Sequence, residues 1–220
     1  MIRVGGKQRR GVPGSRAAKK DMYKNIDVTS GSNNIVNGIS AKTLSPLVGN
    51  LKIVDNGMEF HQFENWWQGN KVYIELGHYN PLTKSTTPKF KAFQNKWAKS
   101  VVGKRRPPEI LINGRVLIPS FAMYNNYTPY DYKNARFVYL QKYCDVIKNL
   151  PIIQELVKLV KSGQNIMIID NDGPCSSEYP EGVPISWNVL NNKIRDLSRP
   201  FGHGYIVAII VFVLSHVKSY

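Results

Sequence analysis

Three residues with complementary chemistry, Glu64, Gln68 and Lys71, occur at spacings of four and three. In a helix these spacings place a carboxylate, an amide and an ammonium group on one face. Trp66 and Trp67 lie among them, so part of this face is aromatic and could stack against a base or a sugar ring. The alternative is a solvated helix face that is stabilised by pairing of the glutamate with the lysine.

Two further carboxylates, Asp170 and Asp172, follow the apolar run Ile166–Ile169. Two residues apart at the end of a strand, they would point to the same side, where each could raise the proton affinity of the other. This arrangement suits acid–base catalysis. The alternative is a turn that closes the strand, because Asp172 is followed by glycine and Asp-Gly is a common turn dipeptide.

The segment Arg199-Pro-Phe-Gly-His-Gly204 directly precedes an apolar stretch. Its glycines permit close approach of the backbone, and amide groups at the start of a following helix could hold a phosphate together with Arg199. His203 alone is more often structural than catalytic. The chain has neither a P-loop nor a dinucleotide-binding glycine motif, and its histidines lack zinc-motif spacing. We therefore expect no metal and no cofactor.

The charge of the chain predicts a polyanionic partner. Thirty Lys and Arg residues face fifteen Asp and Glu residues, a formal net charge of +15. Such an excess favours binding of a nucleotide or a nucleic acid. The candidate contacts fall in the first twenty residues, which contain no acid, and in a Pro-bounded loop: Arg9, Arg10, Lys19, Lys20, Lys104, Arg105 and Arg106.

Residues 1–50 are rich in Gly, Ser and Asn and have only scattered apolar residues. Such a segment cannot offset its ordering entropy by burial, so the pattern predicts a basic flexible arm and linker. The arm could bind phosphate or simply keep the protein in solution. Residues 51–220 are predicted to form one globular α+β domain, and the hydrophobic content of 42% excludes disorder of the whole chain.

Within that domain the apolar spacing predicts mostly helices with a small sheet. An Asn-Gly pair between two apolar runs indicates a hairpin. The predicted elements are a strand over 51–54, helices over 60–73, 89–102, 134–149 and 151–163, a hairpin over 109–118, a strand over 166–169, a helix or loop over 187–195, and a buried helix or strand over 204–217.

The most apolar stretch, Tyr205–Leu214, is about half the length that a spanning helix needs. We expect it to be buried core, with no membrane insertion, and the basic N-terminal residues lack the apolar run of a secretory leader. Two cysteines without a CxxC motif favour a reducing compartment, the cytoplasm or nucleus, or a virion.

The order of these motifs resembles the NADAR family of ADP-ribose N-glycosidases over about residues 59–216. The similar segments are Phe63–Lys71, Tyr143–Leu156, Ile166–Asp172 and the turn Gly202–Gly204. The chain departs from the family where a histidine usually follows the glutamate. The closing Arg-Pro-Phe-Gly-His-Gly turn is also similar to that of a group of uncharacterised viral proteins, which implies no activity.

The resemblance implies an α+β fold and hydrolysis of the bond that joins ADP-ribose to a base or a similar group. Glu64 would stabilise the developing sugar cation, Lys71 would polarise the ribose and leaving group, and Asp170 or Asp172 would orient water. The substrate contacts would be Trp66, Trp67, Gln68, Arg199, Gly202, His203 and Gly204. The competing hypothesis is a non-enzymatic nucleic-acid-associated protein, such as a virion component.

Overall fold

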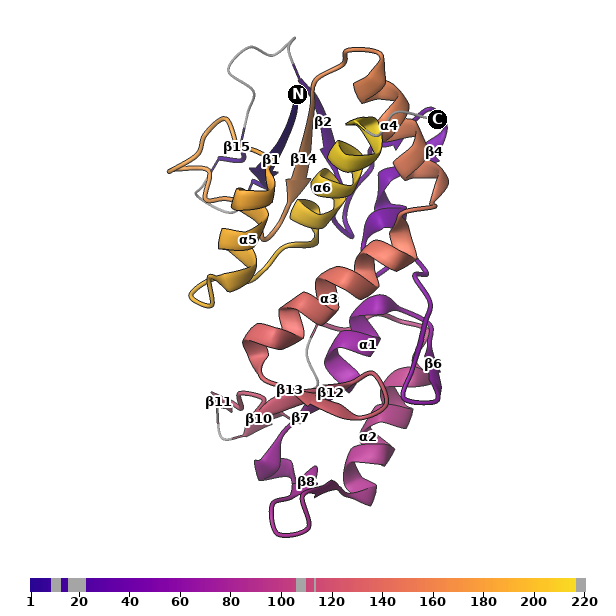
Figure 1. Cartoon of the computed structure of the whole chain (residues 1–220), viewed down its shortest axis with the longest axis vertical. Helices are drawn as coiled ribbons and strands as arrows, with labels where there is room; N and C mark the ends of the chain where they lie inside the picture. Colours follow the sequence, from indigo (N-terminus) through magenta and orange to yellow (C-terminus); the bar gives the residue numbers. More distant parts are fainter. Residues whose placement is uncertain (9–12, 16–22, 106–109, 113, 217–220) are drawn as a thin grey trace. The chain divides into compact units, whose positions relative to one another are not determined.

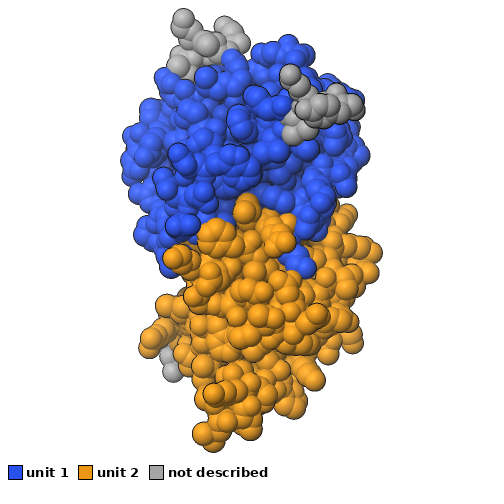
Figure 2. All heavy atoms as spheres, viewed as in Figure 1, with its two compact units in different colours: residues 1–45, 142–220 blue, residues 46–141 orange. Residues whose placement is uncertain are grey.

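The computed structural model describes residues 1–8, 13–15, 23–105, 110–112 and 114–216. It has an α+β fold with six α-helices among the described residues and several small sheets, as the sequence predicts. The chain divides into two compact units (Figure 2). Unit 1 comprises residues 1–45 and 142–220, and unit 2 comprises residues 46–141. The first unit is therefore assembled from both ends of the sequence.

Unit 1 is an open sheet covered by helices (Figure 1). Its strands are β1 (Ile2–Gly6), β2 (Lys24–Asp27), β14 (Ile166–Asp170) and β15 (Val183–Pro184), and its helices are α4 (Pro151–Lys161), α5 (Trp187–Arg195) and α6 (His203–His216). A short hairpin, β3 (Ile35–Val36) and β4 (Ile39–Ser40), and the 3₁₀ turn η1 (Ala41–Leu44) complete it.

The sheet has the strand order β15-β1-β14-β2, with β14 parallel to both β1 and β2 and β15 antiparallel to β1. All five residues of β14 are buried. A strand covered on both faces by other elements is typically a continuous apolar run, which is what Ile166–Ile169 provides. The carboxyl ends of the three parallel strands lie at one edge of the sheet, and this edge contains Asp170.

Helix α6 packs against β1, β14, α4 and α5. Figure 1 shows it along the sheet. Residues Gly204–Val211 are buried, so the prediction that Tyr205–Leu214 belongs to the core is confirmed as far as Val211, whereas residues 212–214 are partly exposed. Among the described residues, no helix combines the length and apolar character needed to cross a bilayer.

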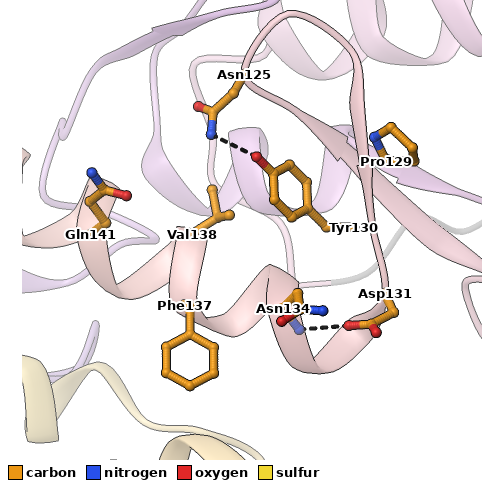
Figure 3. A pocket seen from close by; sticks show the side chains of 8 residues that line it. All are labelled: Asn125, Pro129, Tyr130, Asp131, Asn134, Phe137, Val138 and Gln141. Carbon is orange, nitrogen blue, oxygen red and sulfur yellow. Dashed lines mark hydrogen bonds between the residues drawn. The ribbon is translucent and has the colours of Figure 1, made fainter.

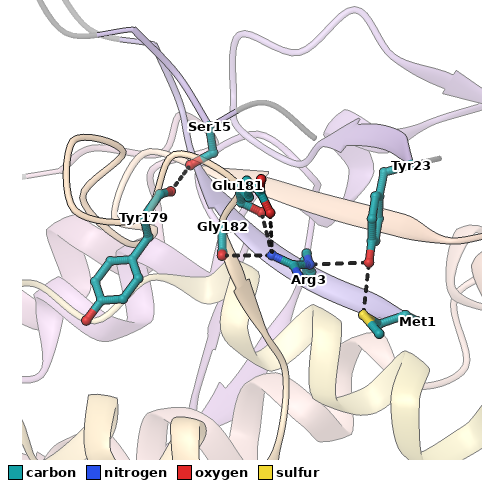
Figure 4. Close-up of polar contacts among 7 residues, drawn as sticks. All are labelled: Met1, Arg3, Ser15, Tyr23, Tyr179, Glu181 and Gly182. Carbon is teal, nitrogen blue, oxygen red and sulfur yellow. Dashed lines mark hydrogen bonds and ion pairs between the residues drawn. The ribbon is translucent and has the colours of Figure 1, made fainter. Parts of the chain in front are cut away.

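The predicted flexible arm is wrong for several stretches of residues 1–50, because β1, β2, the hairpin of β3 and β4, and η1 all lie there. Ile2–Gly6 and Lys24–Asp27 are strands that flank β14, and Ile2 and Val4 are buried in the core. Arg3 donates from Nη1 to the carbonyl oxygens of Glu181 and Gly182 (Figure 4). Pairing with β14, which is 164 residues from the partner residues of β1 and 142 from those of β2, supplies the burial and hydrogen bonds that the local sequence lacks.

Unit 2 contains α1 (Phe63–Gly69), α2 (Pro88–Ala98) and several two- or three-stranded ribbons. Its strands are β5 (Ile53–Asp55), β6 (Met58–Phe60), β7 (Lys71–Val72), β8 (Tyr79–Asn80), β9 (Ser85–Thr86), β10 (Leu111–Ile112), β11 (Arg115–Val116), β12 (Phe121–Tyr124) and β13 (Thr128–Tyr130), and η2 (Ile74–Leu76) is a 3₁₀ turn. Helix α3 (Tyr132–Ile147) begins in unit 2, and its last residues belong to unit 1.

Local signals explain where several helices begin and end. Thr87 Oγ1 accepts from the Phe90 amide and Pro88 occupies the first position of α2, both common features of a helix start. Pro151 likewise occupies the first position of α4, and Gly163 follows that helix with a φ angle of +89°. The antiparallel pair β10 and β11 confirms the predicted hairpin, whose residue 113 lies outside the described part.

Candidate functional site

A hydrogen-bonded chain joins the three side chains that the sequence groups together. Gln68 Nε2 donates to Glu64 Oε1 over 2.7 Å, and Lys71 Nζ donates to Gln68 Oε1 over 2.9 Å. Gln68 is buried, whereas Glu64 and Lys71 are partly exposed. The arrangement places a carboxylate, an amide and an ammonium group in one connected cluster, which we call the Glu64 cluster.

The predicted helix over 60–73 is wrong at both ends, because Phe60 belongs to β6 and α1 spans only Phe63–Gly69. Asn70 Nδ2 donates to the Trp66 carbonyl oxygen and so satisfies a backbone acceptor in the last turn of α1. The next two residues pair with Phe121 and Ala122 of β12. Lys71 therefore reaches Gln68 from a strand, and the cluster depends on the bend between α1 and β7.

An aromatic group surrounds the cluster. The Trp67 ring is stacked with Tyr124 at 5.8 Å between centroids, and Tyr139 meets it edge-on at 5.0 Å. Lys71 Nζ lies 4.9 Å from the centroid of the Trp67 ring. Burial, with smaller contributions from the carboxylates of Asp55 and Glu64, raises the pKa of Tyr124 well above its ordinary value. Tyr124 therefore stays a neutral hydroxyl beside the cluster.

The two tryptophans have different environments. Trp66 is fully buried, and its Nε1 donates to Asp55 Oδ2 over 2.8 Å, so it belongs to the core and has no exposed face for a ligand. Its predicted role in substrate binding is wrong for this reason. Trp67 is partly exposed. Of the pair, Trp67 is the side chain that could contact a substrate ring.

A small cavity borders the cluster, lined by Trp67, Lys71, Tyr132 and neighbouring residues of unit 2. Its volume of about 10 Å³ is enough for no more than one water molecule. A sugar or a base cannot enter it. A substrate of the Glu64 cluster would bind at the exposed surface of Glu64 and Lys71.

The second predicted group lies in unit 1, at the carboxyl end of β14. Asp170 is 1% exposed, and its Oδ2 accepts from the Gly204 amide over 2.8 Å. The same oxygen lies 3.4 Å from His203 Nδ1, while His203 Nε2 lies 3.1 Å from the Val28 carbonyl oxygen. The Asp170 carboxylate therefore accepts the hydrogen bond of an amide at the start of α6 that was predicted to hold a phosphate.

The glycines of the closing turn are required by this close packing. A Cβ at Gly202 would collide with Asp170 Oδ2 and would lie 2.8 Å from the Asp172 carbonyl oxygen. We expect Gly202→Ala to lower the free energy of unfolding by about 1–3 kcal/mol, as overpacking does elsewhere. Denaturant unfolding measures this change.

The matched control is Gly31→Ala, because the nearest atom to a Cβ there is Lys7 Nζ at 3.8 Å. It should leave stability almost unchanged. Equal midpoints for wild type and Gly202→Ala would show that the turn has room for a side chain.

The remaining unit 1 candidates are exposed. Asp172 lies in the turn after β14, outside the buried environment of Asp170. Arg199 Nη2 is 3.0 Å from Glu178 Oε1, and both side chains are about half exposed. The Glu64 cluster belongs to unit 2, and Asp170, Asp172 and Arg199 belong to unit 1.

Near the same sheet edge, Lys7 Nζ forms an ion pair of 2.8 Å with Asp27 Oδ2 and donates to Thr29 Oγ1. Burial opposes ionisation of Asp27, but hydrogen bonds from Lys7 and Thr29 outweigh it and hold the pKa of the carboxyl below its ordinary value of 3.8. The Lys7 ammonium group is therefore held by the side chains of Asp27 and Thr29.

A carboxyl group whose pKa is lower in the folded than in the unfolded state stabilises the fold at pH values above its unfolded-state pKa. This contribution is lost as the pH falls through the folded-state pKa. We expect acid to reduce the stability of wild type more than that of Asp27→Asn, in the range below 3.8. Urea unfolding at a series of acid pH values measures the difference. Parallel curves would contradict the assignment.

The predicted nucleic-acid contacts are only partly described. Lys104 and Arg105 are exposed, and the Lys104 amide donates to Asn65 Oδ1 over 3.1 Å, which attaches this loop to α1. Arg9, Arg10, Lys19, Lys20 and Arg106 lie outside the described residues.

The described part of the chain contains no group of three or more His, Cys, Asp or Glu residues that is arranged to hold a metal ion. Cys144 and Cys175 are both free thiols.

Comparison with models of protein families, with curated proteins and with solved structures found no match to this chain.

Two features of unit 2 were not predicted as functional. Asp55 is buried and organises a loop through Asn125, and a pocket lies beside that loop. The sequence signals this pocket only by the density of Asn and Tyr over 124–132. The residues that anchor the loop, Asp55 and Asn56, come from a distant part of the chain.

Proposed function

We propose that this protein hydrolyses N-glycosidic bonds, with Glu64 as the carboxylate that stabilises the sugar cation. The supporting observation is the chain from Lys71 through Gln68 to Glu64 beside Trp67. A fixed carboxylate in a partly desolvated setting interacts strongly with the positive charge that develops at the anomeric carbon. Gln68 fixes Glu64 Oε1, which reduces the reorganisation needed during the reaction.

The other side chains have complementary roles in this proposal. Lys71 donates to Gln68, and its positive charge can attract an electron-rich leaving group. Trp67 offers a partly exposed ring to the substrate. Asp172 and Arg199 belong to unit 1, so the proposal gives them no role at the Glu64 cluster. Asp170 is better explained as the residue that binds the start of α6.

The proposed substrates are ADP-ribosylated nucleotides or nucleic acids. The test incubates the full chain with an ADP-ribosylated nucleoside and with an ADP-ribosylated oligonucleotide, and measures free ADP-ribose by chromatography and mass spectrometry. We expect release above the rate in buffer. Absence of release from both substrates by folded protein would refute the proposal.

A second candidate function, nucleic-acid binding without catalysis, is favoured by the charge of α2. The helix and the residue after it carry lysines on the exposed side and no acid: Lys89, Lys91, Lys96 and Lys99. The solvated side of α2 is therefore basic. Such a row of cations can neutralise several phosphates.

The triple substitution of Lys89, Lys91 and Lys99 by glutamine is expected to weaken DNA or RNA binding. Each lost phosphate contact should reduce the slope of log affinity against log salt by about 1. The control replaces Lys52, Lys148 and Lys158, which are ion-paired with acids, and makes the same change in net charge. Equal slopes for the two triple variants would exclude α2 as the binding surface.

A further inference from the structure

Unit 2 contains a second, larger pocket beside the turn between β12 and β13 and the first turns of α3 (Figure 3). Its volume is about 610 Å³, within the range of small-molecule sites. The polar side chains that line it are those of Asn125, Tyr130, Asp131, Asn134 and Gln141. The Glu64 cluster does not contribute to it.

One wall of the pocket includes Asn125, which lies in a loop whose backbone conformation most residues avoid. Asn125, Asn126 and Tyr127 have consecutive positive φ angles of 49°, 62° and 62°. Buried groups hold them in place: Asp55 Oδ1 accepts from the Asn125 amide, and Asn56 Oδ1 accepts from the Tyr127 amide. The wall is therefore fixed from within the unit before any ligand binds, which lowers the entropic cost of binding.

The opposite wall is the start of α3. Asp131 Oδ1 accepts from the Asn134 amide over 2.7 Å, as a residue that caps a helix does. Asn134, Val138 and Gln141 follow one another at spacings of four and three, so they share one face of the helix. This face presents two exposed amide side chains to the pocket.

The chemistry of these groups indicates the class of ligand. Each Asn or Gln amide provides a donor and an acceptor side by side, which matches two adjacent hydroxyl groups. Asn125 Nδ2 donates to Tyr130 Oη over 3.2 Å, so these two polar groups are oriented together. Although the chain has 30 Lys and Arg residues, none is among the described residues that line the pocket.

We propose that this pocket binds a neutral ring with vicinal hydroxyl groups, as sugars have. The Asp131 carboxylate and the lack of a lining cation disfavour a phosphate. The amides, the tyrosine hydroxyl and the carboxylate supply the donors and acceptors that hydroxyl groups need. The inference is independent of hydrolysis at Glu64.

Two sources of a vicinal diol are distinguished by the choice of probes. The uniformly ¹⁵N-labelled full chain is titrated with the methyl glycosides of glucose, mannose and galactose, and separately with adenosine. The matched negative probes are methyl 3-deoxyglucoside and 2′-deoxyadenosine, which have no two hydroxyl groups on adjacent carbons. Inorganic phosphate is the charged probe. The readout is the shift of the side-chain amide signals of Asn125, Asn134 and Gln141.

We expect saturable shifts with a glycoside if the source is a free sugar, and with adenosine if it is the ribose of a nucleoside. Asn134→Leu and Gln141→Leu should each weaken binding roughly tenfold or more, since one bidentate contact is lost. Asn191→Leu, an exposed amide on α5, should bind as wild type does.

Two results would overturn the proposal. The first is that none of the diol probes gives saturable shifts at millimolar concentration. The other is equal binding of the deoxy probes or of phosphate. Circular dichroism of each variant confirms its folding, and Gln141→Leu serves as the second test should Asn134→Leu fail to fold.

Discussion

Replacement of Glu64 by glutamine is expected to lower the rate of N-glycoside hydrolysis by roughly a hundredfold or more, the size of one major electrostatic contribution. Glutamine keeps the size of the side chain, and its amide oxygen can still accept the hydrogen bond from Gln68 Nε2. It removes the negative charge that would face the sugar cation. Single-turnover release of ADP-ribose at equal concentrations of folded protein measures the effect.

Glu75→Gln is the matched control, because Glu75 is an exposed carboxylate of the same unit outside the cluster. It should retain the wild-type rate. Equal rates for wild type and Glu64→Gln would remove Glu64 from the centre of the reaction while leaving an enzyme possible. Loss of activity in both variants would indicate a general effect of charge.

Replacement of Val207 by aspartate is expected to destabilise unit 1 by about 3–5 kcal/mol, the usual cost of an unpaired buried charge. Val207 is 0% exposed, on the helix that packs against β1 and β14. The total stability of a domain is often only 5–15 kcal/mol, so this one change can unfold much of the protein. Urea unfolding followed by circular dichroism gives the difference.

Two controls separate burial from charge. Val207→Ala removes volume without adding charge and should cost less, while Leu197→Asp introduces the same charge at a side chain that is 50% exposed. Leu197→Asp is expected to leave stability within about 0.5 kcal/mol of wild type. A similar loss from Val207→Asp and Leu197→Asp would contradict the buried position of α6.

Several elements were predictable because their signals are local. The turn at Gly114, Pro151 at the start of α4 and Gly163 after it each act within a few residues, and the structure confirms the elements that they delimit. The apolar run of β14 was predicted for a related reason, since its composition alone requires burial.

Other features depend on partners far away in the sequence. The first strand, with Arg3 and two glycines, has the composition of an arm, and only its pairing with β14 makes it part of a sheet. The end of α1 before Lys71 depends on β12. The pocket depends on Asp55, whose contact with Asn125 spans 70 residues. Spacing within one segment contains no information on such contacts.

The strand order of unit 1 has a consequence for how the chain folds. During synthesis β1 and β2 emerge first, yet both pair with β14, which follows some 140 residues after β2. Unit 2, by contrast, is encoded in one continuous stretch. Contacts between distant segments form slowly because a long loop must close first. The edges of β1 and β2 therefore stay unpaired until late, and aggregation of nascent chains should be most pronounced for products that end before residue 166.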